Sequence, residues 1–292
     1  MEGTSRVAPS ELTAGLETPS GKGRADENFP VGSFLIRREL RPHIHAFYRF
    51  AREADDIADN AALAAAEKVR RLARMGEILD GASGTESPAA LAMRRSLAET
   101  RLGGQHCHDL LRAFTMDATK LRYRDWDDLM TYCRYSATPV GRQVLDLHGE
   151  SQTTWTWSDP LCDALQVLNH LQDCAADYRA LDRVYLPEQD LAACGSSVAD
   201  LTAPAATQGL RRVIDRLLDG TDVLIEKARN LPRSVESPGL RRETAVIVAL
   251  AERLARRLRR GDPLATRVKL SRGDFAAALL TGLWRGRRWG QR

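Results

Sequence analysis

The chain has 292 residues, of which 43% are hydrophobic and 28% are charged, a balance that excludes a mainly disordered protein and indicates a large buried core. No apolar run approaches the ~20 residues that a membrane-spanning helix needs. The net charge of +4 is unevenly distributed, because the segment from Arg253 to the C-terminus carries twelve Lys or Arg and only two Asp.

The basic C-terminal end admits three interpretations. It is a helix with a solvated basic face, a contact for an anionic membrane surface, or a contact for nucleic acid. Trp284 and Trp289 alternate there with arginines, a pattern that favours membrane over nucleic acid, and we expect no nucleic acid partner. Membrane contact would be peripheral, at the inner face of the membrane.

The cysteines indicate a reducing compartment. They are scattered singly, without a C-x-x-C pair, and their number is odd, which argues against a disulfide framework and a structural zinc site. We therefore expect a cytoplasmic protein. The five cysteines are Cys107, Cys133, Cys162, Cys174 and Cys194.

Helical patterns dominate the chain, and alternating β-branched runs are nearly absent. Residues 1–27 lack the apolar core of a signal peptide and are expected to form a disordered leader. Residues 28–33 are expected to form a loop, in which Ser33 can cap the first helix. The helices expected next are, in chain order, residues 34–59 (interrupted near Pro42), 61–79, 88–102, 107–120, 126–148 (kinked at 139–141), 158 to an end at 185–187, a short element from 187, 210–230, 241–260 and 274–284.

About ten helices without a clear linker predict one all-α domain. We assign it to residues 28–284, followed by a basic tail at 285–292.

Aspartates four residues apart occur on two of the expected helices. Asp55 and Asp59 form one pair, and Asp173 and Asp177 form another, one turn after Asn169. Side chains at this spacing share one face of a helix, where like charges repel. A single such pair is usually a solvated face, but two pairs in apolar helices favour a bound cation.

Two facing carboxylate helices would suit Mg²⁺, which proteins hold with a few carboxylates together with substrate phosphates and water. Such a site would bridge the protein to a diphosphate and assist its departure. Arg52, Arg179 and Arg183 lie close to the aspartates in sequence, and either clamp the diphosphate or form intrahelical salt bridges.

These motifs resemble those of the squalene/phytoene synthase family. The residues that carry the resemblance are FYRFAREADDIAD at 47–59, YCRYSATPVG at 132–141, LNHLQDCAADYR at 168–179 and RVYLP at 183–187. The resemblance extends over about residues 28–284. It implies the all-α class I isoprenoid synthase fold, a single helical domain around a central cavity, and Mg²⁺-dependent ionisation of prenyl diphosphates.

Within the family, the motifs are most similar to the bacterial branch that converts presqualene diphosphate to hydroxysqualene on the hopanoid route. That reaction is a carbon–oxygen lyase step in which the diphosphate ionises, the cation rearranges and water captures it. It needs no nicotinamide cofactor, and the chain has no Gly-rich dinucleotide motif.

Gln172 stands where squalene and phytoene synthases commonly have an arginine. The missing positive charge argues against condensation of two farnesyl diphosphates, and Gln172 is a candidate to hold the water. Squalene, presqualene diphosphate or phytoene-type synthesis is the alternative within the family. A non-enzymatic helical scaffold docked on a membrane is the alternative outside it.

The resemblance and the spacing together assign the expected roles. Tyr48 and Gln172 join the four aspartates as expected catalytic residues, whereas His45 and His170 are expected to pack. The expected Mg²⁺ ligands are Asp55, Asp59, Asn169, Asp173 and Asp177, with Asp56 as a further candidate. The expected substrate-binding residues are Arg52, Asn169, Arg183, Tyr132 and Tyr185, of which the tyrosines can also be core residues.

Overall fold

The structure is a computed structural model that describes the backbone of residues 37–289 and the side chains as far as residue 282. Within these residues every regular element is a helix, which confirms the all-α prediction. The α-helices are α1 (Arg41–Asp59), α2 (Ala65–Leu79), α3 (Pro88–Thr100), α4 (Gln105–Thr119), α5 (Trp126–Ser136), α6 (Thr138–Leu147), α7 (Trp155–Leu181), α8 (Glu188–Ala193), α9 (Gln208–Ala228), α10 (Leu231–Ser234), α11 (Pro238–Arg260) and α12 (Arg272–Trp289).

Proline positions explain two helix starts. Pro42 lies in the first turn of α1, where its missing N–H costs no hydrogen bond, so the helix begins at Arg41. The single kinked helix expected at 126–148 is instead two helices, α5 and α6, that meet at Ala137. Pro139 lies in the first turn of α6, and the Thr138 hydroxyl donates to the Arg134 carbonyl at 2.6 Å across the break.

The central helix α7 ends earlier than its sequence pattern indicates. Asp182 adopts a left-handed conformation with φ 51°, which closes the helix after Leu181. Aspartate is one of the few residues besides glycine that visits this conformation without a large cost. Residues 183–187 therefore leave α7 as a separate buried segment, which is the feature that positions Arg183 and Tyr185.

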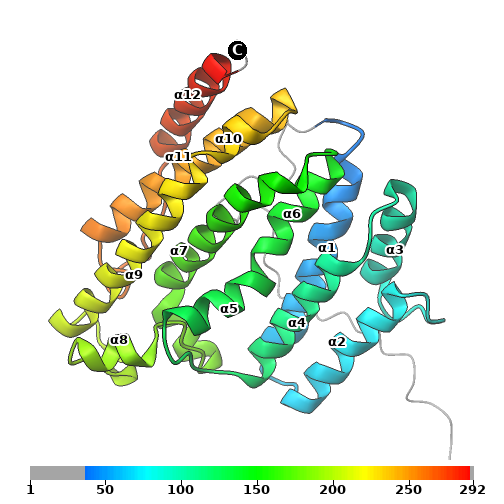
Figure 1. Ribbon diagram of the computed structural model, residues 1–292. Helices are drawn as coiled ribbons and strands as arrows, with labels where there is room; N and C mark the ends of the chain where they lie inside the picture. Colours follow the sequence, from blue (N-terminus) through cyan, green and yellow to red (C-terminus); the bar gives the residue numbers. More distant parts are fainter. Residues whose placement is uncertain (1–36, 290–292) are drawn as a thin grey trace, which may run out of the picture.

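The described residues form two large hydrophobic cores. The N-terminal core is built from α1 to α4 and includes Phe50, Ile57 and Met75, all fully buried. The C-terminal core is built mainly from α5, α7, α9 and α11 and includes Leu168 and Leu254. Helix α7 packs against α5, α6, α9 and α11, and lies in the middle of the molecule (Figure 1).

Helix α12 lies along α11 at the edge of the molecule (Figure 1). Gly282 permits this approach, because a Cβ atom there would lie 2.5 Å from Cγ2 and 2.8 Å from the backbone nitrogen of Val246. The helix continues to Trp289 and so includes the first five residues of the predicted basic tail. The predicted leader 1–27, the loop 28–33 with its Ser33 cap, and residues 290–292 lie outside the described part of the chain.

Candidate active site

The first aspartate pair lies on the half-exposed face of α1. Phe47, Phe50 and Ile57 bury the opposite face, which leaves Asp55 and Asp59 partly accessible. These positions follow from the helical period, since residues that alternate at three and four steps share a face.

Arg52 forms intrahelical ion pairs with the same helix face. Its guanidinium donates to Asp55 at 2.6 Å and to Asp56 at 2.8 Å. This is the salt-bridge alternative of the sequence analysis. The side chains of Arg52 and Asp55 remain 20% and 29% exposed, so the pair stays accessible to a ligand.

The second pair lies on the half-buried face of α7. Leu168, Leu171 and Ala175 are buried against the C-terminal core, whereas Asp173 and Asp177 are partly accessible. Asn169 and Tyr48 are likewise partly accessible, each on the helix that carries an aspartate pair.

Arg267 forms a bidentate ion pair with Asp173. Its Nε lies 2.7 Å from Oδ1 and its Nη2 lies 2.8 Å from Oδ2. Arg267 comes from the segment between α11 and α12, 94 residues away in sequence. A cation that competes with a metal for Asp173 is therefore already part of the fold.

Arg183 joins the end of α1 to α4. The residue is 6% exposed, and Nη1 donates to the Asp59 carboxylate at 2.8 Å while Nη2 donates to the Asp117 carbonyl at 3.0 Å. The Asp117 carboxylate lies 3.6 Å from Nε. Burial alone would lower the pKa of Arg183, but these two carboxylates and Tyr185 together raise it above the ordinary value, so the group stays charged.

Asp117 is the buried counterion of this network. It is 4% exposed and accepts hydrogen bonds from the hydroxyls of Tyr132 at 2.8 Å and Tyr185 at 2.7 Å. Burial raises the pKa of Asp117 to about 6, although Arg183 and the two hydroxyls oppose the rise. The carboxylate that balances the charge of Arg183 is therefore fixed by two hydroxyl donors, while Arg183 itself holds Asp59 directly.

The tyrosines of the network belong to an aromatic cluster. Tyr185 stacks on His170 with ring centroids 3.5 Å apart and on Tyr123 with centroids 5.4 Å apart. Burial, followed by the charge of Arg183, lowers the pKa of His170 to about 3, so this histidine is neutral at physiological pH. It packs, as expected from the sequence.

Gln172 is buried beside the segment that carries Arg267. It is 3% exposed, and its Nε2 donates to the Val268 carbonyl at 2.5 Å. The residue that distinguishes this chain from the common family pattern therefore fixes the backbone next to Arg267.

Replacing Gln172 with leucine, which keeps a similar volume but cannot donate, is expected to destabilise the protein by about 1 kcal/mol, because the Val268 carbonyl loses its donor. Turnover and product distribution are expected to change as well, since the Arg267 segment loosens. Thermal unfolding and product analysis measure both, with the exposed Gln189→Leu as control. An unchanged rate and product mixture would remove Gln172 from the site.

The structure brings Arg183, Asp59, Tyr132 and Tyr185 together, but it leaves Arg179 at the surface. Arg179 is exposed and donates to the Leu201 carbonyl at 3.5 Å, which is a weak contact. Nothing in this position supports the clamp that sequence proximity to Asp177 indicated.

Two charged residues of the site, Asp117 and Arg267, were not predicted from the sequence. The sequence does contain a signal for Asp117, because this residue extends the apolar stripe of Leu110 and Ala113 on α4. A carboxylate in a buried stripe needs buried partners. The sequence contains no such signal for Arg267, because its pairing with Asp173 depends on the path of the chain between α11 and α12.

The donor set fits a metal that is shared with a ligand. Among residues 37–289, no three His, Cys, Asp or Glu side chains lie close enough to hold a metal ion by themselves. The available donors are carboxylates and one carboxamide in two groups, which suits a hard cation completed by phosphate oxygens and water.

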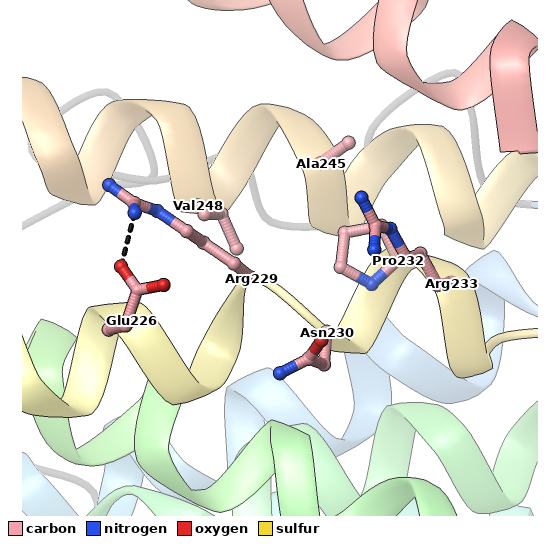
Figure 2. A pocket seen from close by; sticks show the side chains of 7 residues that line it. All are labelled: Glu226, Arg229, Asn230, Pro232, Arg233, Ala245 and Val248. Atoms are coloured by element: carbon pink, nitrogen blue, oxygen red, sulfur yellow. Dashed lines mark hydrogen bonds and ion pairs between the residues drawn. The ribbon is translucent and has the colours of Figure 1, made fainter.

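A cavity of about 410 Å³ between α9, α10 and α11 lies away from these residues (Figure 2). Its lining includes no aspartate of either pair, and its Arg229 is neutralised by Glu226 and Glu252. It is not part of the candidate site.

No helix of the described residues is long and apolar enough to cross a membrane.

An all-α domain with aspartate pairs on two of its helices is the arrangement of a class I isoprenoid synthase. The sequence model of the squalene/phytoene synthase family matches residues 22–274. The chain is 46% identical to a hydroxysqualene synthase of Rhodopseudomonas palustris over 267 residues, 91% of each chain. It is 45% identical to a hydroxysqualene synthase of Zymomonas mobilis over 257 residues, 87% of this chain and 86% of the other.

A solved structure agrees with these sequence matches. A squalene synthase of Alicyclobacillus acidocaldarius superimposes with a TM-score of 0.71 at 35% identity, over 81% of this chain and 90% of the other. The chain belongs to the squalene/phytoene synthase family. The family resemblance predicted from the motifs is thereby confirmed. The alternative of a non-enzymatic helical scaffold is not supported.

Proposed function

We propose that this protein converts presqualene diphosphate to hydroxysqualene in squalene and hopanoid biosynthesis. The observation that carries the proposal is the identity of 46% and 45% with hydroxysqualene synthases over most of the chain. In this reaction the diphosphate ionises, the cyclopropylcarbinyl cation rearranges and water captures it. Product analysis with presqualene diphosphate and farnesyl diphosphate, offered separately, tests the proposal.

Mg²⁺ is the proposed cofactor, held by the carboxylates and the carboxamide of the two helices together with the substrate diphosphate. When bound, it supplies Lewis-acid assistance to the departure of the diphosphate. The proposed ligands are Asp55, Asp59, Asn169, Asp173 and Asp177, with Asp56 as a further candidate. A rise in melting temperature that needs both Mg²⁺ and diphosphate would support this site, because a ligand that binds only the folded state stabilises it.

Three arginines are placed to compensate charge at the aspartate faces. Arg52 is partly accessible beside Asp55, and its guanidinium fork suits a diphosphate that approaches this face. Arg267 can exchange Asp173 for a phosphate oxygen when a metal takes the carboxylate. Arg183 is buried, so its proposed role in substrate binding is to hold the Asp59 carboxylate in a fixed orientation.

The tyrosines have two proposed roles. Tyr48 is partly accessible on α1 and is proposed to line the substrate site, where an aromatic face stabilises a cation by about 2 kcal/mol or more once water is excluded. Tyr132 and Tyr185 are 3% and 6% exposed with their hydroxyls on Asp117, which supports a positioning role.

Gln172 is proposed to help hold the water that captures the cation. Its amide nitrogen is engaged by the Val268 carbonyl, which fixes the orientation of the whole side-chain amide. A fixed amide next to Asp173 is a suitable neighbour for an ordered water molecule.

Condensation of two prenyl diphosphates is the second candidate. The similarity to a squalene synthase structure at 35% identity favours it. The glutamine at position 172 argues against it, since the guanidinium common at that position in squalene and phytoene synthases is absent from this chain.

We propose that the protein is cytoplasmic and contacts the inner face of the membrane through its basic C-terminal end. The sequence supports this proposal, because Trp284 and Trp289 alternate with arginines and aromatic residues suit the membrane interface.

Deleting residues 285–292 is expected to weaken binding to anionic vesicles at least about tenfold, since each basic residue near such a surface contributes about 1 kcal/mol. Vesicle co-sedimentation with phosphatidylglycerol, and with phosphatidylcholine as control, measures the effect. Equal binding by the full and shortened chains would contradict the proposal.

A further inference from the structure

Beside the aspartate face of α7 lies a group of arginines of which only Arg267 has a place in the reaction described above. A hollow of about 600 Å³ lies between the C-terminal half of α11, the segment 261–268 and the start of α12. We call it the arginine hollow. Its lining residues are Arg253, Arg256, Arg257, Arg260, Gly261, Thr266, Arg267, Val268 and Asp274.

The helical period explains why the arginines gather. Four of them lie on α11 at successive steps of three, one and three residues, which is one face of a helix. Leu250, Leu254 and Leu258, on the adjacent face of the helix, are buried in the core. Cations near a helix C-terminus are favoured by the helix dipole, but like charges at these spacings also repel one another.

The arginines of the hollow exceed the carboxylates that could neutralise them. Five guanidinium groups face one carboxylate, Asp274, which already pairs with Arg257 at 2.6 Å. Hydrogen bonds from Ser271 and Arg257 outweigh burial and lower the pKa of Asp274 to about 2, so it stays ionised.

Arg267 pairs with Asp173 outside the lining, and the other three guanidinium groups, those of Arg253, Arg256 and Arg260, have no carboxylate partner within the part of the chain that the structure describes. Arg256 and Arg260 are exposed and form no ion pair with residues 37–282. The Nε of Arg253 is buried, and no described residue accepts a hydrogen bond from it. Neighbouring Arg259, by contrast, pairs with Asp219 and Asp222.

Arg267 connects the hollow to the candidate active site. It lines the hollow, and its guanidinium pairs with Asp173 on α7. Gln172 holds the adjacent Val268, which also lines the hollow. The same short segment therefore forms one wall of the hollow and one edge of the aspartate face.

We propose that the arginine hollow is a phosphate-binding site, separate from the site held by the aspartates. The planar guanidinium fork matches two oxygens of a phosphate group, and several such groups in one concave site favour a multiply charged ligand such as inorganic diphosphate. A volume of about 600 Å³ is enough for a diphosphate or for the phosphate headgroup of an anionic lipid.

The experiment compares the full-length protein with Arg256→Gln/Arg260→Gln. The control is Arg95→Gln/Arg101→Gln, which removes the same charge from an exposed position within α3 and from the residue that follows this helix, on the far side of the molecule (Figure 1). Inorganic diphosphate is titrated calorimetrically in EDTA, so that the proposed metal site does not contribute. Vesicles of phosphatidylglycerol, and of phosphatidylcholine as reference, form the second arm.

We expect the hollow variant to bind diphosphate at least about tenfold more weakly than the wild type, since each charge-assisted hydrogen bond that is lost contributes strongly to the binding free energy. The α3 control is expected to bind like the wild type. A selective loss for phosphatidylglycerol vesicles alone would also support the site and would identify a lipid headgroup as its ligand.

The proposal is overturned if the hollow variant binds both diphosphate and anionic vesicles with the affinity of the wild type. It is also overturned if the α3 control loses as much affinity as the hollow variant. Asp55→Ala separates this result from the proposed reaction. That variant is expected to lose Mg²⁺-dependent turnover and to retain metal-free diphosphate binding, because Asp55 lies on α1 and does not line the hollow.

Discussion

Replacing Asp55 or Asp173 with alanine is expected to reduce turnover by about a thousandfold or more. Each change removes a carboxylate from one of the two proposed metal-holding faces, and the loss of such charge stabilisation amounts to several kcal/mol, with tenfold in rate for each 1.4 kcal/mol. Steady-state turnover with Mg²⁺ and presqualene diphosphate measures the effect.

The fold is expected to survive these changes. Both side chains are 29% exposed and pair with partly exposed arginines, and such pairs contribute about 1 kcal/mol or less. Asp219→Ala is the matched control, because Asp219 also pairs with an arginine at the surface, Arg259. Variants at Asp55 and Asp173 that keep wild-type turnover would remove the metal-site assignment, whereas a lost helical circular dichroism spectrum would make the activity loss uninformative about it.

Replacing Arg183 with methionine is expected to destabilise the protein by about 3–5 kcal/mol and to abolish turnover. The change keeps most of the side-chain volume but leaves the Asp117 carboxylate buried without its cation and Asp59 without its donor. For a chain of this size the melting temperature is expected to fall by roughly 10 °C. Arg179→Met, at an exposed position, is expected to change stability by less than about 0.5 kcal/mol.

The pH dependence separates a charge effect from a packing effect. The pKa of Asp117 in the folded protein is about 6, above the ordinary value of 3.8, so the folded state favours the protonated carboxyl. The stability contributed by this group is fully present below pH 3.8 and is lost as the pH rises through about 6. Without Arg183 the ionised carboxylate costs more, so the destabilisation by Arg183→Met is expected to be larger at pH 8 than at pH 5.

Asp117→Asn in the same background is expected to recover part of the stability at pH 8, because the buried charge is removed, but none of the turnover. Urea denaturation of the single and double variants at both pH values provides the measurement. A destabilisation that is equal at pH 5 and pH 8, and that Asp117→Asn does not relieve, would show that Arg183 acts only through its volume.

The features predictable from sequence were those with a local period. The four-residue spacing of the aspartates predicted that each pair shares one face of its helix, α1 or α7, and the apolar stripes predicted the helices themselves. The end of α7 was predicted too late, because Tyr185 and Pro187 gave the stop signal while the left-handed Asp182 ends the helix four residues earlier. A single residue in the left-handed conformation leaves no periodic signal in the sequence, so the end of the helix could not be predicted from it.

The contacts that assemble the site were not predictable, because they join distant parts of the chain. Arg183 meets Asp59 across 124 residues, and Arg267 meets Asp173 across 94. For Arg52 the sequence left open a ligand clamp and an intrahelical salt bridge, and the structure shows the salt bridge. Gln172 was recognised as unusual from the family pattern, but its contact with Val268 depends on the fold of the segment after α11.

The most direct test of the proposed reaction is product analysis with the purified protein and Mg²⁺, with presqualene diphosphate and farnesyl diphosphate offered separately. We expect hydroxysqualene from presqualene diphosphate and no product from farnesyl diphosphate. Presqualene diphosphate or squalene formed from farnesyl diphosphate would contradict the proposed reaction, because the protein would then condense two prenyl diphosphates despite the glutamine at position 172.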